Sequence, residues 1–494
     1  MKGIRGKLAK GAFWTLASRV LVNIVSLLST LLLARLLTPE DFGLVAIATA
    51  LLEMVSAASN LSLGNALIRH ADPTDDHFHT TWTLSIIRSA AIGGILAIAA
   101  WPVAFFYGDG RLVPIMLALA SSVMITGFAN PKLIVFSRNL VFSQDFFLQV
   151  SQKASAFIIS LILALIYHSY WALVFGVIAS QVTYLIVSYM LLPHRPRLGL
   201  KHWRELFSFS IWMTLQDLLY TVGWGLDNLL IGGVVGRPAL GHFSVGSNLA
   251  ATPMREAGLS ITKLLFPGLA RVMLDPARIK SAYTSAQALL TAVILPVGVG
   301  IALCARPAVM AFMSAKWLPV IPVIQGLSVI MALQALGMLA KPLAMAKGVT
   351  RLLFQRNLAN FVISVPLSIA GLWLGGLNGI VIARLVSGLV AIGFNLYLVR
   401  QLISLSITQQ LASNGRSLVS TMTMAVGAFS LQSLGHAVPL TVELVSTIVV
   451  GGTLYVATHY LLWAASGKGE GPERELMAFA DKMVAVLRAR RAMH

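Results

Sequence analysis

The stretch GAFWTLASRVLVNIVSLLSTLLL, from Gly11 to Leu33, decides the fold class of this chain. It holds one charged residue, Arg19. A spanning α-helix needs about 20 mostly apolar residues, so the stretch is long enough to cross a bilayer. It lacks the small-residue cleavage site of a secretory signal peptide, and we therefore expect it to stay in the protein as a membrane helix.

The rest of the chain has the same character. Of its 494 residues, 57% are hydrophobic and 11% are charged, whereas an average soluble domain has about 25% charged residues. This composition excludes a soluble globular protein and predicts an all-α integral membrane protein with about 14 transmembrane helices. The predicted helices cover residues 11–34, 44–67, 83–106, 113–135, 148–167, 171–192, 209–235, 241–262, 285–305, 320–340, 358–375, 377–399, 418–435 and 440–464.

The net charge of +19 has two possible sources, a basic surface for nucleic acid or the Lys/Arg excess of cytoplasmic loops. With the N-terminus inside, about 28 of the 37 Lys and Arg residues fall in cytoplasmic segments and about five in outer loops. This bias predicts a multi-pass membrane protein with both termini cytoplasmic and no nucleic-acid partner. The remaining arginines lie within predicted spans: Arg19, Arg88, Arg255 and Arg384.

The connecting loops are short and leave no room for a catalytic domain outside the bilayer. No phosphate-binding motif of the form G-x-x-x-x-G-K-[ST] occurs, and the lone Cys304 cannot form an intrachain disulfide. Residues Asp75 to His79 read DDHFH, which resembles a metal site but lacks a third ligand at suitable spacing, so we expect a solvated loop there. We expect a protein that is not an enzyme and that holds no metal or other cofactor.

An internal repeat is visible at the start of each half of the chain. The shift that places Trp14 on Trp212 also places Gly43 on Gly241. Duplication of this kind gives transporters two lobes related by a pseudo-two-fold axis along the membrane normal. We therefore predict two pseudo-symmetric six-helix lobes followed by two C-terminal helices.

The predicted organisation follows from the spans and the repeat. It consists of a cytoplasmic N-terminal segment (1–10), an N-lobe (11–192), a cytoplasmic interlobe loop (193–208), a C-lobe (209–399), two further helices (418–464) and a cytoplasmic amphipathic tail (465–494).

Several stretches resemble one known family. KGAFW at residues 10–14 and LLLARLLTPEDFGLVAIA from Leu31 are similar to the first two helices of the bacterial polysaccharide flippases of the multidrug/oligosaccharidyl-lipid/polysaccharide exporter superfamily. RNLVF from Arg138 resembles an inner loop of that family, and FP at Phe266, LDPAR at Leu274 and KWLP at Lys316 are similar to its middle region. The resemblance covers residues 8–400 and is nearest to the branch of colanic-acid and succinoglycan-type exopolysaccharide transporters.

The resemblance implies a carrier that flips oligosaccharide repeat units linked to undecaprenyl pyrophosphate across the inner membrane. It would work by alternating access, without covalent chemistry, and would supply exopolysaccharide or O-antigen biosynthesis. The implied partners are this lipid-linked substrate, membrane lipids and a polysaccharide polymerase or export complex. An ion or proton gradient, or removal of the product outside, would drive the step.

A pyrophosphate that enters a low-dielectric cleft needs fixed positive charge. The family's cleft is framed by the first two helices of each lobe, and this favours Arg19 and Arg255 as its ligands. The repeat also sets Arg19 opposite Asp217, so the two side chains could face each other across the cleft. Alternatively, Arg19 snorkels to the inner interface.

Sugar hydroxyls need hydrogen-bond partners and stacking surfaces, although an Asn in a helix bundle often bonds a neighbouring helix instead. The candidates for sugar binding are Asn23, Gln216, Asn248 and Trp212. Ion coupling needs an acid within the spans, where desolvation can raise a carboxyl pKa. The candidates for coupling are Glu53, Asp217, Asp227 and Glu256.

Two other functions remain open. A multidrug or cation antiporter on the same fold would favour acids rather than arginines in its cleft, and such exporters usually have fewer spans. A membrane glycosyltransferase or polymerase usually needs a larger loop outside the membrane than this chain has.

Overall fold

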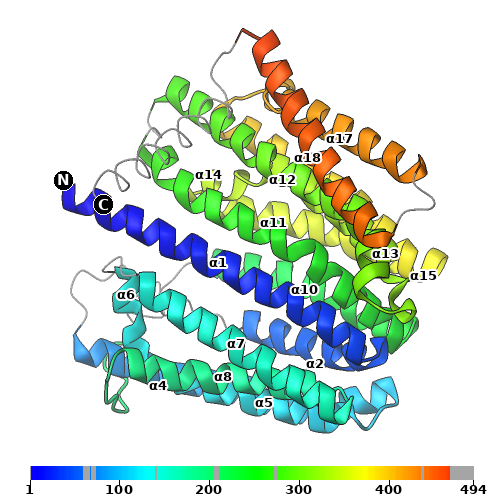
Figure 1. Ribbon diagram of the computed structural model, residues 1–494. Coiled ribbons are helices and arrows are strands. Elements are labelled where there is room, and N and C mark those ends of the chain that lie inside the picture. Colours follow the sequence, from blue (N-terminus) through cyan, green and yellow to red (C-terminus); the bar gives the residue numbers. More distant parts are fainter. Residues whose placement is uncertain are drawn as a thin grey trace, which may run out of the picture. The chain divides into compact units, whose positions relative to one another are not determined.

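The computed structural model describes residues 2–58, 67, 74–138, 142–203, 211–271, 275–434 and 439–467. Within these ranges the regular elements are helices and no strand occurs (Figure 1). The all-α prediction is therefore confirmed. The predicted tail falls almost entirely outside the described residues.

The helix bounds follow the predicted apolar runs closely. The first part of the chain contains α1 (Lys2–Leu36), α2 (Pro39–Ala58), α4 (Asp75–Tyr107), α5 (Leu112–Gly127), η1 (Pro131–Leu133), α6 (Ile134–Arg138), α7 (Phe142–Tyr167) and α8 (Trp171–Leu191). The second part contains α10 (Ile211–Val234), α11 (Arg237–Arg271), α12 (Pro276–Phe312), η2 (Ala315–Trp317), α13 (Val320–Gln334), η3 (Ala335–Gly337), α14 (Ala340–Ala346), α15 (Thr350–Ile403), α16 (Ile407–Ala412), α17 (Gly415–Leu434) and α18 (Leu440–Ala465).

Each predicted run overlaps one of these helices. Among the described residues, 8 helical segments are long and apolar enough to cross a membrane, and two shorter apolar helices cover Leu112–Gly127 and Leu218–Val234. A multi-span membrane protein is thus confirmed, whereas the count of fourteen crossings stays a prediction.

One long helix contains two of the predicted spans. Within α15, Gly375 (φ −146°, ψ 16°) and Gly376 (φ 54°, ψ −130°) leave the helical region of the backbone. Gly376 has a positive φ, which glycine adopts readily because it has no Cβ. The turn expected between residues 358–375 and 377–399 is therefore present.

Helix α4 begins earlier than hydropathy predicts. The backbone N–H of Thr74, which precedes the first turn, donates to Nδ1 of His77 at 3.2 Å, and the helix ends at Gly108 with a left-handed φ of 61°. Charged residues are common in a first helical turn, but they carry no apolar signal. The expected solvated loop at Asp75 to His79 is wrong: these residues form the first turns of α4, and His77 is buried.

The chain divides into two compact units. Unit 1 comprises residues 1–246, 312–320 and 357–380, and unit 2 comprises residues 247–311, 321–356 and 381–494. Within unit 1, α7 packs against α8, α4 against α5, α1 against α7, and α10 against α2. The predicted lobe boundaries stay a prediction.

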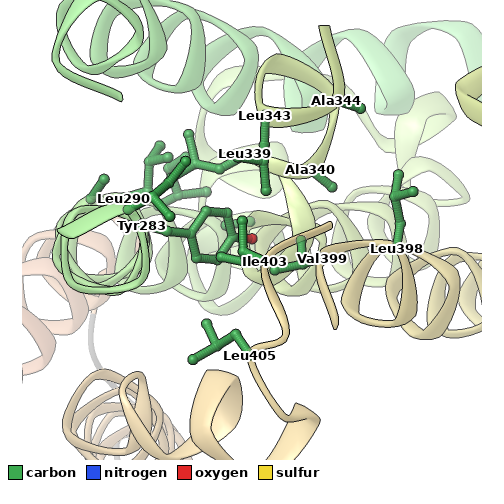
Figure 2. Packing of buried hydrophobic residues seen from close by; sticks show 14 of the residues in the cluster. Tyr283, Leu290, Leu339, Ala340, Leu343, Ala344, Leu398, Val399, Ile403 and Leu405 are labelled. Carbon is green, nitrogen blue, oxygen red and sulfur yellow. The ribbon is translucent and has the colours of Figure 1, made fainter. Parts of the chain in front are cut away.

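Unit 2 has its own apolar core, shown in Figure 2. Tyr283 and Leu290 of α12 lie among Leu339, Leu343 and Ile403, and all five are buried. The C-terminal helices α17 and α18 pack against each other.

Candidate functional site

The connections of two helical hairpins, both in unit 1, are related by the repeat seen in the sequence. Helix α1 ends at Leu36 and α2 begins at Pro39, while α10 ends at Val234 and α11 begins at Arg237. The shift that aligns the tryptophans of the two halves also aligns both pairs of helix bounds. The duplication is therefore visible in the structure at these hairpins.

The beginnings of α2 and α11 touch each other reciprocally through glycine. A Cβ built on Gly43 would collide with the backbone carbonyl oxygen of Arg237, and a Cβ built on Gly241 would collide with that of Pro39. Both distances fall well below those that real Cβ atoms adopt. The repeat relates Gly43 to Gly241 and Pro39 to Arg237, so this is the self-complementary contact that a pseudo-two-fold axis produces.

Four charged side chains surround this contact. Asp109, between α4 and α5, is only 7% exposed and accepts hydrogen bonds from Arg237 and from Arg111. Arg111 Nη2 also lies 2.6 Å from Glu40 Oε1, and Arg237 Nη1 lies 3.4 Å from the same oxygen. Both carboxylates are thus shared between the two arginines.

The electrostatics of this group keep Asp109 and Arg111 ionised. Burial opposes ionisation of Asp109, but hydrogen bonds from the Arg111 side chain and backbone, with the charges of Arg237 and Arg111, lower the pKa of its carboxyl group. Hydrogen bonds to Asp109 and Glu40 raise the pKa of the Arg111 guanidinium. Asp109 and Arg111 are therefore both charged at neutral pH.

A buried tryptophan completes the contact from the connection after α12. Trp317 is fully buried, and its indole N–H donates to the backbone carbonyl oxygen of Ala34 at 2.5 Å. Its ring meets Phe42 edge-on, with centroids 5.3 Å apart. We call the set of Glu40, Gly43, Asp109, Arg111, Arg237, Gly241 and Trp317 the α2/α11 junction.

The predicted pyrophosphate ligand Arg19 lies on α1. Its neighbour Ser18 donates to Gln149 of α7 at 3.3 Å, and Trp14 packs edge-on against Phe146 of the same helix. Arg19 and Asn23 are half-buried and lie one turn apart on α1, about 100° and 140° around the helix from Ser18. Their roles as ligands stay a prediction.

The sequence analysis does not name a further cation, Lys153, which lies on α7, the helix that packs against α1. Because α7 begins at Phe142, Lys153 lies about 16 Å along that helix. It is one turn beyond Gln149, on the side of α7 that faces α1. Among the described residues it has no ion pair or hydrogen bond. The predicted span 148–167 already contains Lys153, so a charge inside an apolar run is the signal that singles it out.

The other predicted residues are placed less completely. Asp227 is buried on α10, whereas Glu53 on α2 and Asn248 on α11 are exposed. The side chains of Trp212, Gln216, Asp217, Arg255 and Glu256 lie outside the described residues. The arrangement of Arg19 with Arg255 or Asp217 thus stays a prediction. Within the described part of the chain, no group of three or more His, Cys, Asp or Glu could hold a metal ion.

The sequence has relatives among curated proteins. A family model described as "Polysaccharide biosynthesis protein" matches residues 32–322. The succinoglycan biosynthesis transport protein ExoT of Rhizobium meliloti (strain 1021) is 22% identical over 451 residues, which cover 90% of this chain and 90% of that protein. The lipopolysaccharide biosynthesis protein WzxC of Escherichia coli (strain K12) is 20% identical over 397 residues, covering 77% of this chain and 78% of that protein.

Solved structures share the fold. The lipid II flippase MurJ, in an inward closed conformation, matches with a TM-score of 0.67 at 13% identity, over 92% of this chain and 99% of that chain. An inward-facing multidrug resistance MATE transporter of the MOP superfamily matches with a TM-score of 0.63 at 16% identity, over 80% of this chain and 98% of that chain. The fold is therefore that of an all-α membrane transporter.

Proposed function

Because this chain belongs to the polysaccharide biosynthesis protein family, we propose that it flips oligosaccharide repeat units linked to undecaprenyl pyrophosphate across the bacterial inner membrane. Transport proceeds by alternating access and supplies exopolysaccharide or O-antigen assembly, without covalent chemistry. The names of ExoT and WzxC, a transport protein and a biosynthesis protein for surface polysaccharides, support the proposal.

The observation that carries the mechanism is the α2/α11 junction. Alternating access requires a closure at one end of the pathway that can part without unfolding either side. The junction joins the ends of two duplicated hairpins through a small glycine contact and a ring of charges, rather than through a large apolar core. Such a contact can open as two intact helical hairpins move apart.

The junction closes the extracytoplasmic end in this proposal. The Lys/Arg bias places both termini in the cytoplasm, so the α1–α2 and α10–α11 connections lie on the outer side. A substrate entering from the inner leaflet would then meet a closed exit, and release outside requires the Arg237 contacts to part.

The substrate headgroup is held by cations on the spans. Arg19 on α1 and Lys153 on α7 lie on two helices that pack against each other, and Arg255 on α11 is assigned as a further candidate. A pyrophosphate can accept charge-assisted hydrogen bonds from arginine and lysine side chains. Sugar contacts are assigned to Asn23, Gln216, Asn248 and Trp212.

Coupling is assigned to the acids within the spans. The candidates remain Glu53, Asp217, Asp227 and Glu256, of which Asp227 is buried on α10. A polysaccharide polymerase or export complex would receive the repeat unit on the outer face.

The proposal is tested by deleting the gene and assaying lipid-linked repeat units in each leaflet. We expect accumulation in the inner leaflet, restored by the wild-type chain and by Arg278→Ala, whose exposed side chain makes a local ion pair. Arg19→Ala should restore transport about tenfold less well, since one charge-assisted contact contributes about 1.5–3 kcal/mol. Normal polymer with lost drug resistance would instead support the multidrug antiporter and refute the proposal.

A further inference from the structure

The connection between α8 and α10 is fastened to the first turns of α4. The backbone N–H of Arg197 donates to Nδ1 of His79 at 3.1 Å, and that of Gly199 donates to Oγ1 of Thr83 at 3.0 Å. We call residues 194–202 the α4 strap. The strap has no helix or strand of its own, so side chains of α4 serve as its hydrogen-bond partners.

Two parallel histidine pairs lie in this seam. The rings of His77 and His202 stack with centroids 3.8 Å apart and planes 13° apart. Those of His79 and His194 stack at 5.6 Å and 9°. One member of each pair belongs to α4 and the other to the strap, so four of the 10 histidines of the chain meet here.

The hydrogen bond at His79 defines its protonation state. A backbone N–H can only donate, so Nδ1 of His79 must be bare to accept from Arg197, and the ring must be neutral. A proton on Nδ1 would place two N–H groups against each other and break this contact. His77 accepts from the backbone N–H of Thr74 in the same way, at 3.2 Å.

The charged neighbours do not remove this constraint. Asp75 is paired with Lys132 at 2.7 Å and Asp76 with Lys201 at 3.0 Å, so each carboxylate near His79 already has a cation. Burial, and then the charge of Lys132, lower the pKa of His194, and Asp75 opposes them. The stacked partner of His79 is therefore neutral in the folded protein at neutral pH.

We propose that the α4 strap is loosened by acid: protonation of His79 breaks its contact with the Arg197 N–H and frees the strap around it, while Lys201 stays paired with Asp76. Histidine is the side chain that titrates between about pH 5 and 8. The His79 contact requires a neutral ring, so it is complete at the upper end of this range and is lost as the pH falls. Release frees the connection between the sixth and seventh predicted spans, and it does so whatever the substrate is.

The test is hydrogen–deuterium exchange of the full-length protein in lipid nanodiscs. From about pH 8 to about pH 5.5, the protection of the Arg197 and Gly199 amides should fall in the wild type. We expect a loss of about three- to tenfold, the range of one net hydrogen bond. The effect of pH on intrinsic exchange is removed by comparing variants at each pH.

The decisive variant is His79→Asn. Its side-chain oxygen can accept from the Arg197 N–H but cannot take up a proton in this range. We expect strap protection that does not change with pH in His79→Asn and low protection at every pH in His79→Ala. Equal pH responses in the wild type and in His79→Asn would overturn the proposal.

If His79→Asn does not fold, a second variant tests the same contact from the strap side. Arg197→Pro removes the donor N–H from the strap and leaves α4 unchanged. Protection of the Gly199 amide should then be low and independent of pH. A pH response of Gly199 as large as that of the wild type would overturn the proposal.

Discussion

The α2/α11 junction and the α4 strap each contain a backbone N–H that donates to a titratable side chain, but the acceptors differ. The Arg111 N–H donates to a carboxylate oxygen of Asp109 at 2.9 Å, and the Arg197 N–H donates to an imidazole nitrogen of His79 at 3.1 Å. The carboxylate accepts while it is ionised, and the imidazole accepts while it is neutral. Acid therefore loosens the strap in a pH range where the junction remains intact.

The two regions also differ in what closes them. At the junction, backbone meets backbone at Gly43 and Gly241, so no side chain can yield to make room. At the strap, side chains of α4 bridge to an extended backbone, and they can rotate away. Added atoms should therefore disrupt the junction, whereas a lower pH should not. For the strap we expect a strong effect of pH and a weak effect of added atoms.

The largest expected effect comes from adding one methyl group at the junction. Gly241→Ala or Gly43→Ala places a Cβ against a carbonyl oxygen, and overpacking costs about 1–3 kcal/mol. If the closed junction is part of the transport cycle, the translocation rate should fall about tenfold or more. The measurement is the rate at which repeat units reach the outer leaflet.

Gly94→Ala is the matched control for this prediction. A Cβ at Gly94 of α4 meets no atom within 4 Å, so transport should be unchanged. Transport at the wild-type rate in Gly241→Ala would show that the glycine contact has no part in the cycle.

The next effect concerns the shared charges. Arg237→Gln leaves the buried Asp109 with Arg111 as its remaining cation, and Asp109→Asn removes the charge that both arginines share. In a double-mutant cycle on the free energy of unfolding, measured in detergent, the pair should be coupled by about 1–3 kcal/mol. Additive effects would mean that Arg237 contributes nothing to holding Asp109.

A pH series compares the two regions in one sample. The pKa of Asp109 is lowered by folding, so its contribution is fully present above about pH 4 and is lost as the pH falls through the folded value. Exchange at the Arg111 amide should therefore keep the same protection from about pH 8 to about pH 5.5, while that at Arg197 loses protection. Parallel losses at both amides would contradict the contrast between them.

The smallest effect is expected at Lys153 on α7, which belongs to neither region. Lys153→Met removes one of several proposed cations, so transport should fall about three- to tenfold through weaker substrate binding. Lys153→Arg should recover most of the rate because it keeps the charge. Lys153→Met at the wild-type rate would remove this residue from the substrate site.

Much of the fold was predictable because its helices coincide with long apolar runs in the sequence. The runs located the helices, and the pair Gly375-Gly376 located the turn within α15. The polar ends of helices were not predictable in this way. Helix α7 begins at Phe142 rather than 148, and α4 begins at Asp75 rather than 83, because charged first turns contribute no hydropathy.

Some residues of the candidate site could likewise be predicted from the sequence, and others could not. Arg19 and Asn23 could be found because a charge or an amide inside an apolar run is conspicuous. The partners of Asp109 could not, since Arg237 lies 128 residues away and only the folded chain brings the two together. The repeat supplied a clue, because it paired Gly43 with Gly241 before their contact was visible.

The most direct test of the flippase proposal is a reversible clamp on the α2/α11 junction. In a Cys304→Ser background, Glu40→Cys and Arg237→Cys introduce two thiols where the side chains now approach to 3.4 Å. A reducible bifunctional thiol reagent then joins them in liposomes that carry undecaprenyl-pyrophosphate-linked repeat units. We expect translocation to stop when the clamp closes and to return when it is reduced; translocation that continues through the closed clamp would contradict the proposal.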